Sequence, residues 1–252
     1  MKPNKKYVDS NGNQYAMYPN PVMNITQSIN GYTSHRGTFA IDDAQENTGR
    51  SNGYAPCDMV CVATDYVNGN AMFWQSQRPV RTKKYGITYI YMMVIHDNTA
   101  NARVGMTIKQ GEQLFTEGTA GFATGNHNHI EVGIGKYPGY MYTTSGYLTS
   151  WGATVYMMPG NVNPSDVFFI DDTRIIVNGG LNWSKINAVQ PEKPKLTNVV
   201  AEHYAAKYIV DGVQIHKDSP NGPVVGKHKT GDIVEYFAKT VYNGHRWIQD
   251  AK

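Results

Sequence analysis

The chain has 252 residues, 40% of them hydrophobic, and its formal net charge is only +3. This length fits one medium domain followed by a small one, and the hydrophobic content excludes a disordered chain. The low charge and the lack of a basic stripe exclude nucleic acid as the expected partner. Gly, Tyr, Asn and Thr are abundant and helical periodicity is missing, so we expect a mainly β fold.

The first 20 residues are polar and lack the apolar stretch of a secretory signal. The longest apolar run of the chain, Tyr89–Ile95, is much shorter than the roughly 20 residues that a membrane-spanning helix needs. We therefore expect a protein that is neither inserted into a membrane nor exported by a signal peptide.

Residues 1–185 are expected to form a strand-rich domain. Their apolar runs are short and are separated by clusters of Gly, Asn and Pro, which is typical of a β-dominated fold. The predicted strands include Met59–Ala63, Ile87–Ile95, Ile130–Ile134 and Thr154–Met158.

Residues 186–198 separate this domain from a second one. The segment is polar, contains two prolines and shows no periodicity, so we interpret it as an interdomain linker, although a Pro-rich surface loop has the same composition. Residues 199–252 then carry a set of short strands and turns of their own. These predicted strands are Lys207–Val210, Gln214–His216, Val224–Val225, Ile233–Phe237 and Trp247–Gln249.

The most informative segment is GNHNHIEVG, residues 125–133. If it forms a strand, the two-residue period places His127, His129 and Glu131 on one face. Two imidazoles side by side on a strand are a potential metal site, although an H-x-H pair alone is a weak signal. Glu131 is either a partner that orients a metal ligand or an ordinary surface carboxylate.

A second candidate segment is SHRGTFAIDDA, residues 34–44. His35 and Asp42 are seven positions apart, so in one straight strand they would point to opposite faces. A turn at residues 36–38 can bring both to one site while the apolar side chains of the strand face the core. Asp43 has the opposite parity, so we select Asp42, although either acid could simply end a strand at a turn.

His96 follows the apolar strand GITYIYMMVI and precedes a turn signal. A histidine near the rim of a sheet is well placed to act on a bound substrate, although a solvated histidine at a strand end would have the same sequence pattern. Together the candidate segments offer imidazoles and a carboxylate. Three protein ligands of N and O type, with a fourth position for water, are the layout of a catalytic zinc site.

Other catalytic classes lack their signatures in this chain. No HExxH motif, no GxSxG motif and no setting for a nucleophilic cysteine occurs. We interpret Cys57 and Cys61 as free thiols; a disulfide across a bend and a thiolate metal pair are the alternatives.

The segments SHRGTFAID, YMMVIH and HNH occur in the same order as the motifs of lysostaphin-type zinc endopeptidases of the bacterial cell wall, and the chain resembles that family over roughly Tyr32 to Gly135. The intervening VGMTIKQGEQLFTEGTAGFATG is similar to the family's V-G-x-x-V-x-x-G-x-x-L/I pattern, with Gly105 and Gly111 in place. The separation between the first histidine and the aspartate is longer than in the best-known members and resembles that of phage-type relatives.

The resemblance implies an antiparallel-sheet peptidase domain that binds one Zn²⁺ ion through His35, Asp42 and His129. It implies that His96 and His127 form the catalytic pair, in which one removes a proton from water and the other stabilises the oxyanion. The expected substrate is bacterial peptidoglycan, and we expect the protein to act as a monomer.

The last part of the chain, VVGKHKTGDIVEYFAKTVYNGHRWIQ, resembles a bacterial SH3 domain of the wall-binding type, with Gly231 and the G-x-R-W of Gly244–Trp247. Residues Asn163–Gly180 resemble the region after the peptidase core of phage endolysins. These resemblances imply a small β-barrel that targets the wall. They also imply an endolysin that is made in the host cytoplasm and reaches the wall after release.

Three alternatives stay open at this point. The chain could be a non-catalytic wall-binding protein with a vestigial metal site. It could be a bacterial wall-remodelling peptidase or a bacteriocin, although such proteins normally carry a secretion signal. It could also cut the muramoyl-alanine amide instead of a peptide bond, which only product analysis decides.

Overall fold

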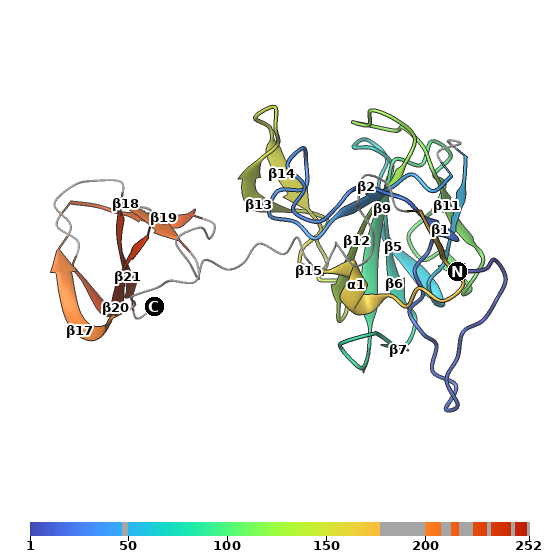
Figure 1. Cartoon of the computed structure of the whole chain (residues 1–252), viewed down its shortest axis with the longest axis horizontal. Coiled ribbons are helices and arrows are strands. Elements are labelled where there is room, and N and C mark those ends of the chain that lie inside the picture. The colour runs from blue at the N-terminus through green and yellow to red at the C-terminus, as the bar shows by residue number, and fades with distance from the viewer. Residues whose placement is uncertain are drawn as a thin grey trace. The chain divides into compact units, whose positions relative to one another are not determined.

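The computed structural model describes residues 1–46, 50–176, 200–207, 213–216, 224–230, 233–242 and 245–250 (Figure 1). The chain forms two compact units, Met1–Gln190 and Pro191–Lys252. The segment expected to be a linker, residues 186–198, lies outside the described residues, so the division into functional domains stays a prediction.

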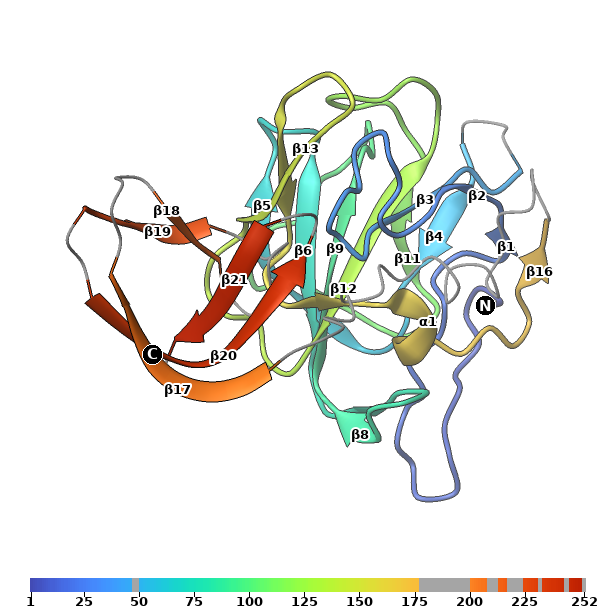
Figure 2. The same cartoon turned by 60° about the vertical axis from the view of Figure 1, so that its left-hand side comes forward.

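The first unit is built around one eight-stranded antiparallel sheet (Figures 1 and 2). Along the sheet its strands are β10 (Thr107–Ile108), β5 (Met59–Asp65), β6 (Ala71–Ser76), β9 (Ile90–Ile95), β12 (Asn128–Ile134), β3 (Ile41–Asp43) and β2 (Ile25–Gln27), and β15 (Asn161–Val162) also pairs with β12. The strand β12 therefore lies in the middle, between β9 and β3.

Smaller elements surround this sheet. They are the parallel pair β1 (Val22–Met23) and β16 (Arg174–Ile175), the antiparallel pairs β4 (Asn52–Tyr54) with β11 (Gln113–Thr116), β7 (Val80–Arg81) with β8 (Ile87–Thr88) and β13 (Thr143–Leu148) with β14 (Thr154–Met157), and the short helix α1 (Pro164–Val167). The helix begins where the side chain of Asn163 accepts a hydrogen bond from Ser165 N–H.

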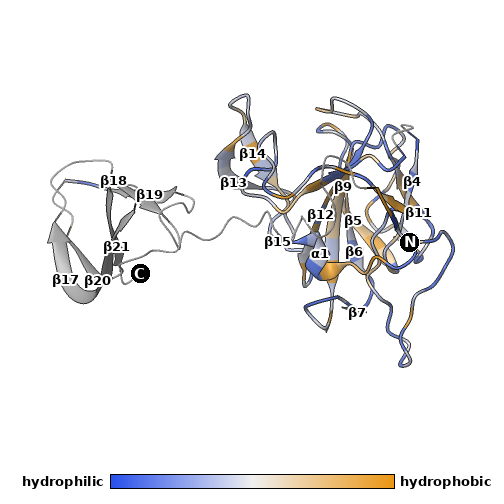
Figure 3. Ribbon diagram, viewed as in Figure 1, coloured by the Kyte–Doolittle hydropathy of each residue, from blue (hydrophilic) through white to orange (hydrophobic). Residues whose placement is uncertain are grey.

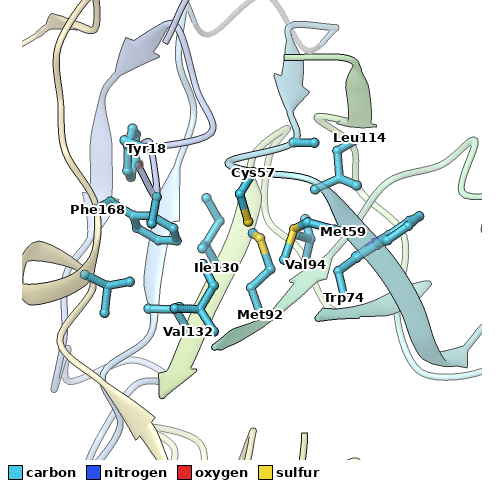
Figure 4. Close-up of a cluster of buried hydrophobic side chains, with 14 of the residues drawn as sticks. Tyr18, Cys57, Met59, Trp74, Met92, Val94, Leu114, Ile130, Val132 and Phe168 are labelled. Atoms are coloured by element: carbon cyan, nitrogen blue, oxygen red, sulfur yellow. The ribbon is translucent and has the colours of Figure 1, made fainter. Parts of the chain in front are cut away.

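Hydrophobic side chains cover both faces of the central strands, because neighbouring residues of a strand point to opposite sides. Trp74 and Met92 belong to the larger core on one face (Figure 4), whereas Phe73 and Met93 belong to a smaller core on the other. In Figure 3 the hydrophobic colour gathers on β5 and β6, and the long loops are mostly hydrophilic. The sheet is therefore packed against a hydrophobic core on each face.

The strands predicted from the sequence largely coincide with strands of the first unit. Met59–Ala63 lies within β5, Ile130–Ile134 lies within β12, and Thr154–Met158 differs from β14 by one residue. The run Ile87–Ile95 is divided, because β8 pairs with β7 and only β9 continues in the sheet. The strand expected to start at His127 begins at the next residue.

The strand β3 separates its two acids as the parity argument predicts. Ile41 is buried in the larger core, and Asp43 contacts that side of the sheet through the hydroxyl of Tyr18, which donates to Oδ2 at 2.6 Å. Asn20 Nδ2 also donates to Oδ2 of Asp43, and the N–H groups of residues 24 and 45 donate to its Oδ1. Asp42 points to the opposite face.

The second unit contains two antiparallel sheets among its described residues. One consists of β17 (Val200–Lys207), β20 (Ile233–Tyr242) and β21 (His245–Asp250), and the other of β18 (Val213–His216) and β19 (Val224–His228). Four of the predicted strands lie within β18, β19, β20 and β21, and the fifth overlaps β17 only at Lys207. Gly231 and Gly244 lie outside the described residues, and the SH3-like barrel stays a prediction.

The expectation of a mainly β protein is confirmed, since α1 is the one α-helix among the described residues. No helix of the described part is long and apolar enough to span a membrane.

Cys57 and Cys61 are free and buried, and burial raises the pKa of the Cys61 thiol to about 11. The interpretation as free thiols is therefore confirmed, and neither belongs to the metal-compatible group of the described residues.

Candidate metal centre

The central sheet brings the segments with candidate residues side by side. In the register of β12 and β3, His129 lies opposite Asp42, and on the other side of β12 it lies opposite Ile95, the residue before His96. The HNH segment is thus placed between the other two candidate strands.

His35 reaches this site from the loop before β3. The N–H of Thr38 donates to the carbonyl of His35 at 2.9 Å, and Gly37 has a positive φ of 73°. The left-handed conformation at Gly37 is favourable only for glycine. The loop therefore turns where the sequence predicts a turn, and it returns the chain so that His35 faces Asp42.

Three side-chain atoms converge at the site. His35 Nε2 lies 3.2 Å from Asp42 Oδ1 and 3.2 Å from His129 Nδ1, and His129 Nδ1 lies 3.1 Å from Asp42 Oδ1. Ligand atoms bound tetrahedrally at about 2.0–2.1 Å from a zinc ion are about 3.3 Å apart. The triangle therefore has the size of one face of a zinc coordination tetrahedron, and the three residues could hold a metal ion.

The outer nitrogens of these two imidazoles determine what points inward. His35 Nδ1 donates to the carbonyl of Ser28 at 3.1 Å, and His129 Nε2 donates to Glu131 Oε1 at 3.1 Å. A neutral imidazole has one N–H, so both inner nitrogens present lone pairs. Together with the carboxylate oxygen of Asp42 they form three electron-pair donors at one point, an arrangement that requires either a cation or added protons.

The pKa values of the metal-free site also indicate that the three donor atoms need a positive charge between them. Burial alone lowers the pKa of His129, but hydrogen bonds to Asp42 and Glu131 outweigh it and raise that pKa to about 10. Burial tends to raise the pKa of Asp42, but the neighbouring His35 and His129 hold it well below its usual value. In the absence of metal, a proton on His129 therefore takes the place of the cation.

Two further histidines line the site. The rings of His96 and His127 lie 4.5 Å apart between centroids, and His127 Nε2 lies 3.7 Å from Asp42 Oδ1. His96 Nδ1 donates to the carbonyl of Ala120 at 2.7 Å, and His127 Nδ1 donates to that of Gly125 at 2.8 Å. In the neutral form each ring thus keeps an unprotonated Nε2.

His96 has unusual surroundings for a histidine. It is almost fully buried, and burial lowers its pKa to about 4, so the ring is neutral near pH 7. Its backbone has a positive φ of 86° and is held by hydrogen bonds from its N–H to Gly69 and from Ala120 N–H to its carbonyl. Non-glycine residues rarely adopt this conformation.

Glu131 is fully buried, which excludes the reading of an ordinary surface carboxylate. Its Oε1 accepts the hydrogen bond from His129, while its Oε2 accepts from Met158 N–H at 3.0 Å and from Asn161 Nδ2. The carboxylate is fixed on both sides, so it orients the His129 ring.

Several contacts of the site were not foreseen from the sequence. Gln27 Nε2 donates to Asp42 Oδ2 at 2.8 Å, and the backbone carbonyls of Ser28 and Ala120 set the orientation of His35 and His96. Beside these groups lies a pocket of about 270 Å³. It is lined by Thr26, Gln27, Thr33, Asp42, Ala44, Thr124, Gly125, Asn126 and His127.

Comparison with known proteins adds a phage relative. No family model matches the sequence. The chain is 32% identical over 175 residues to morphogenesis protein 1 of Bacillus phage B103, and the alignment covers 69% of this chain and 45% of that protein. The chain thus spans less than half the length of the relative that it matches.

Solved structures of peptidases are also similar. Lysostaphin, the antimicrobial peptidase from Staphylococcus simulans, has a TM-score of 0.39 and 15% identity, over 93% of this chain and 87% of its own. A zinc-containing peptidase from Vibrio cholerae has a TM-score of 0.35 and 19% identity, over 51% of this chain and 40% of its own. TM-scores of this size do not establish a shared fold, so both stand as similarities only.

Proposed function

We propose that the chain is a zinc peptidase that hydrolyses peptide bonds of bacterial peptidoglycan. The convergence of His35 Nε2, Asp42 Oδ1 and His129 Nδ1 carries this proposal, because the two outer hydrogen bonds leave only electron-pair donors facing inward. Two imidazoles and a carboxylate match zinc better than calcium or magnesium, which prefer oxygen ligands alone.

In the proposed mechanism His35, Asp42 and His129 would hold a zinc ion. The ion would supply an activated water, because a bound Zn²⁺ lowers the pKa of water to about 7. One of His96 and His127 accepts the proton of the attacking water through its Nε2, and the other stabilises the negative charge on the oxygen of the scissile carbonyl. The backbone carbonyls occupy Nδ1 of both rings. The ring that accepts the proton does so through a free Nε2, whereas the ring that stabilises the oxyanion must carry a proton on Nε2 and act as an imidazolium.

Peptidoglycan as the substrate is supported by the motif order SHRGTFAID, YMMVIH and HNH. The pocket beside the site is lined mainly by small and polar residues, which suits a peptide of small residues. We propose that residues 199–252 add a wall-binding module that concentrates the enzyme on its insoluble substrate. We further propose a phage endolysin that acts as a monomer on the wall after release from the host cytoplasm.

A second candidate function follows from the phage relative. That protein of Bacillus phage B103 is named a morphogenesis protein, and this chain matches 45% of it. The same wall-cutting chemistry would then belong to a component of the phage particle instead of a lysis enzyme. Detection of the chain in purified particles by mass spectrometry favours the particle component, and its absence there favours the endolysin.

The proposed activity is tested on purified walls. Turbidity of a wall suspension should fall when the protein is added, should stay constant after exhaustive chelation, and should fall again when zinc is restored. Mass spectrometry of the fragments then identifies the bond. Clearance that is unaffected by chelation would exclude a metallopeptidase. Whole stem peptides freed from the glycan, with the new amino group on their first alanine, would identify an amidase.

A further inference from the structure

Arg36, the residue after His35, is held between two tyrosine rings. Its guanidinium carbon lies 5.5 Å from the ring centroid of Tyr32 and 5.7 Å from that of Tyr147, and its Nη1 donates to the carbonyl of Leu148 at 3.3 Å. Both tyrosines are exposed, Tyr32 at 72% and Tyr147 at 38%. Cation–π contacts within about 6 Å stabilise an arginine in one orientation.

This arginine has no acidic partner among the described residues. The ion pairs of lysine and arginine side chains there involve other residues. A guanidinium keeps its charge at all physiological pH values and has five N–H donors in a planar fork, of which one is used here. A fixed cation with unused donors is suited to bind a carboxylate in bidentate geometry.

The contacts around Arg36 lead to the pocket beside the candidate metal site. Thr33 lines the pocket, and its carbonyl accepts a hydrogen bond from Ser150 N–H at 2.8 Å in the hairpin of β13 and β14. The same hairpin carries Tyr147, and its Trp151 packs against Phe122, with ring centroids 4.5 Å apart.

Phe122 precedes a second segment that lines the pocket, residues 124–127. The hairpin therefore joins the loop of His35 and Arg36 to the loop of His127. These contacts connect the surroundings of Arg36 with both loops that line the pocket.

We propose that Arg36 binds a free carboxylate of the substrate peptide and thereby selects acidic over amidated peptides. This inference rests on the proposed peptidase function and adds a substrate class to it. Peptide stems of cell walls carry free carboxylates in some walls and primary amides in others, whereas the sugars between them offer neutral hydroxyls. An amide has no negative charge for the guanidinium and presents an NH₂ group towards its donors.

The test uses one soluble cross-linked wall peptide in two forms, with its carboxylates free or converted to primary amides. For the full-length zinc enzyme, KM should be about tenfold higher for the amidated form, with kcat changed little, because a charge-assisted hydrogen bond is lost. Arg36→Gln should raise KM for the acidic form by a similar factor and remove the preference. Arg36→Lys should restore part of it.

Arg103→Gln is the matched control, because Arg103 is exposed and the substitution removes the same charge. It should leave both KM values unchanged. Binding of the two peptides to chelator-treated protein is measured in parallel, so that the preference is tested even if neither peptide is cut. Equal KM and equal binding of the two forms would refute the role of Arg36 while leaving the peptidase intact; absence of cleavage with preferential binding of the acidic form would refute the peptidase alone.

Discussion

Glu131 Oε1 lies 3.1 Å from Nε2 of His129, and this contact determines that Nδ1 of the ring faces Asp42. The buried carboxylate is therefore part of the candidate metal site, although it does not face the point where the three donor atoms meet. Partners of this kind fix the orientation of a ligating histidine and increase its basicity.

Glu131→Gln should weaken zinc binding by about 10- to 100-fold. The amide still fills the space, but its NH₂ group must face either the N–H of His129 or the two donors on the other side. Competition with a chromogenic chelator measures the affinity. Glu112→Gln, at an exposed position, is the control, and an unchanged affinity of the Glu131 variant would show that the contact does not contribute.

Alanine substitutions at the four histidines and the aspartate of the site should have two kinds of effect: loss of bound zinc, or loss of turnover with zinc retained. His129→Ala should lose both bound zinc and hydrolysis, because one of three donor atoms is removed. His127→Ala and His96→Ala should keep zinc and lose turnover. Metal content by mass spectrometry and hydrolysis rates on the same samples measure both properties. Stoichiometric zinc in the His129 variant would show that the ligand assignment is wrong.

Zinc affinity should rise with pH across the neutral range. In the metal-free protein the pKa of His129 is raised to about 10, so at pH 7 the ring carries an extra proton that the metal must displace. Below that pKa each unit of decreasing pH should weaken binding by about tenfold. Calorimetry in buffers of different ionisation enthalpy should detect the released proton. Metal binding without proton release would contradict the protonated state.

Asp43→Asn should destabilise the first unit without removing a ligand. Each carboxylate oxygen of Asp43 accepts two hydrogen bonds. In the asparagine variant the NH₂ group therefore faces two donors at whichever of the two positions it occupies. The expected loss in the free energy of unfolding is about 2–4 kcal/mol. Chemical denaturation measures it, and Asp171→Asn at an exposed position should change it by less than about 0.5 kcal/mol.

The two units should separate in function. A fragment that ends near Lys195 should still cut soluble wall peptides, because every proposed catalytic and ligand residue lies before Gly135. It should lose much of its activity on intact cells, since the local enzyme concentration at the wall falls. Residues 198–252 alone should sediment with purified walls. Full cell lysis by the fragment, with the C-terminal piece remaining in solution, would contradict a targeting role.

The sequence was sufficient to predict which side chains of each segment share a face, because these signals are local. That the segments form one site was implied by the resemblance to the peptidase family. The alternation in HNHIE and the parity of Asp42 against Asp43 follow from the two-residue period of a strand, and the structure places these side chains as expected. The groups that orient them could not be predicted. The carbonyls of Ser28 and Ala120 belong to the backbone, which every residue has, so no residue type marks them.

The lengths of the strands and their pairing partners could not be predicted from the sequence either. The apolar run Ile87–Ile95 looks continuous, but the pairing of β8 with β7 divides it, and pairing depends on residues distant in the chain. The burial of Glu131 could not be decided either, because the cover over it comes from Met158 and Asn161.

His96 occupies a backbone conformation that only glycine adopts without strain, at a cost on the order of 1 kcal/mol for other residues. Substitution by glycine would relieve that strain, so selection for a stable fold alone would favour glycine at this position. The presence of an imidazole at such a position fits the catalytic role that we propose for it. In directed evolution for heat resistance, position 96 is therefore where gains in thermal tolerance should coincide with loss of the proposed hydrolysis.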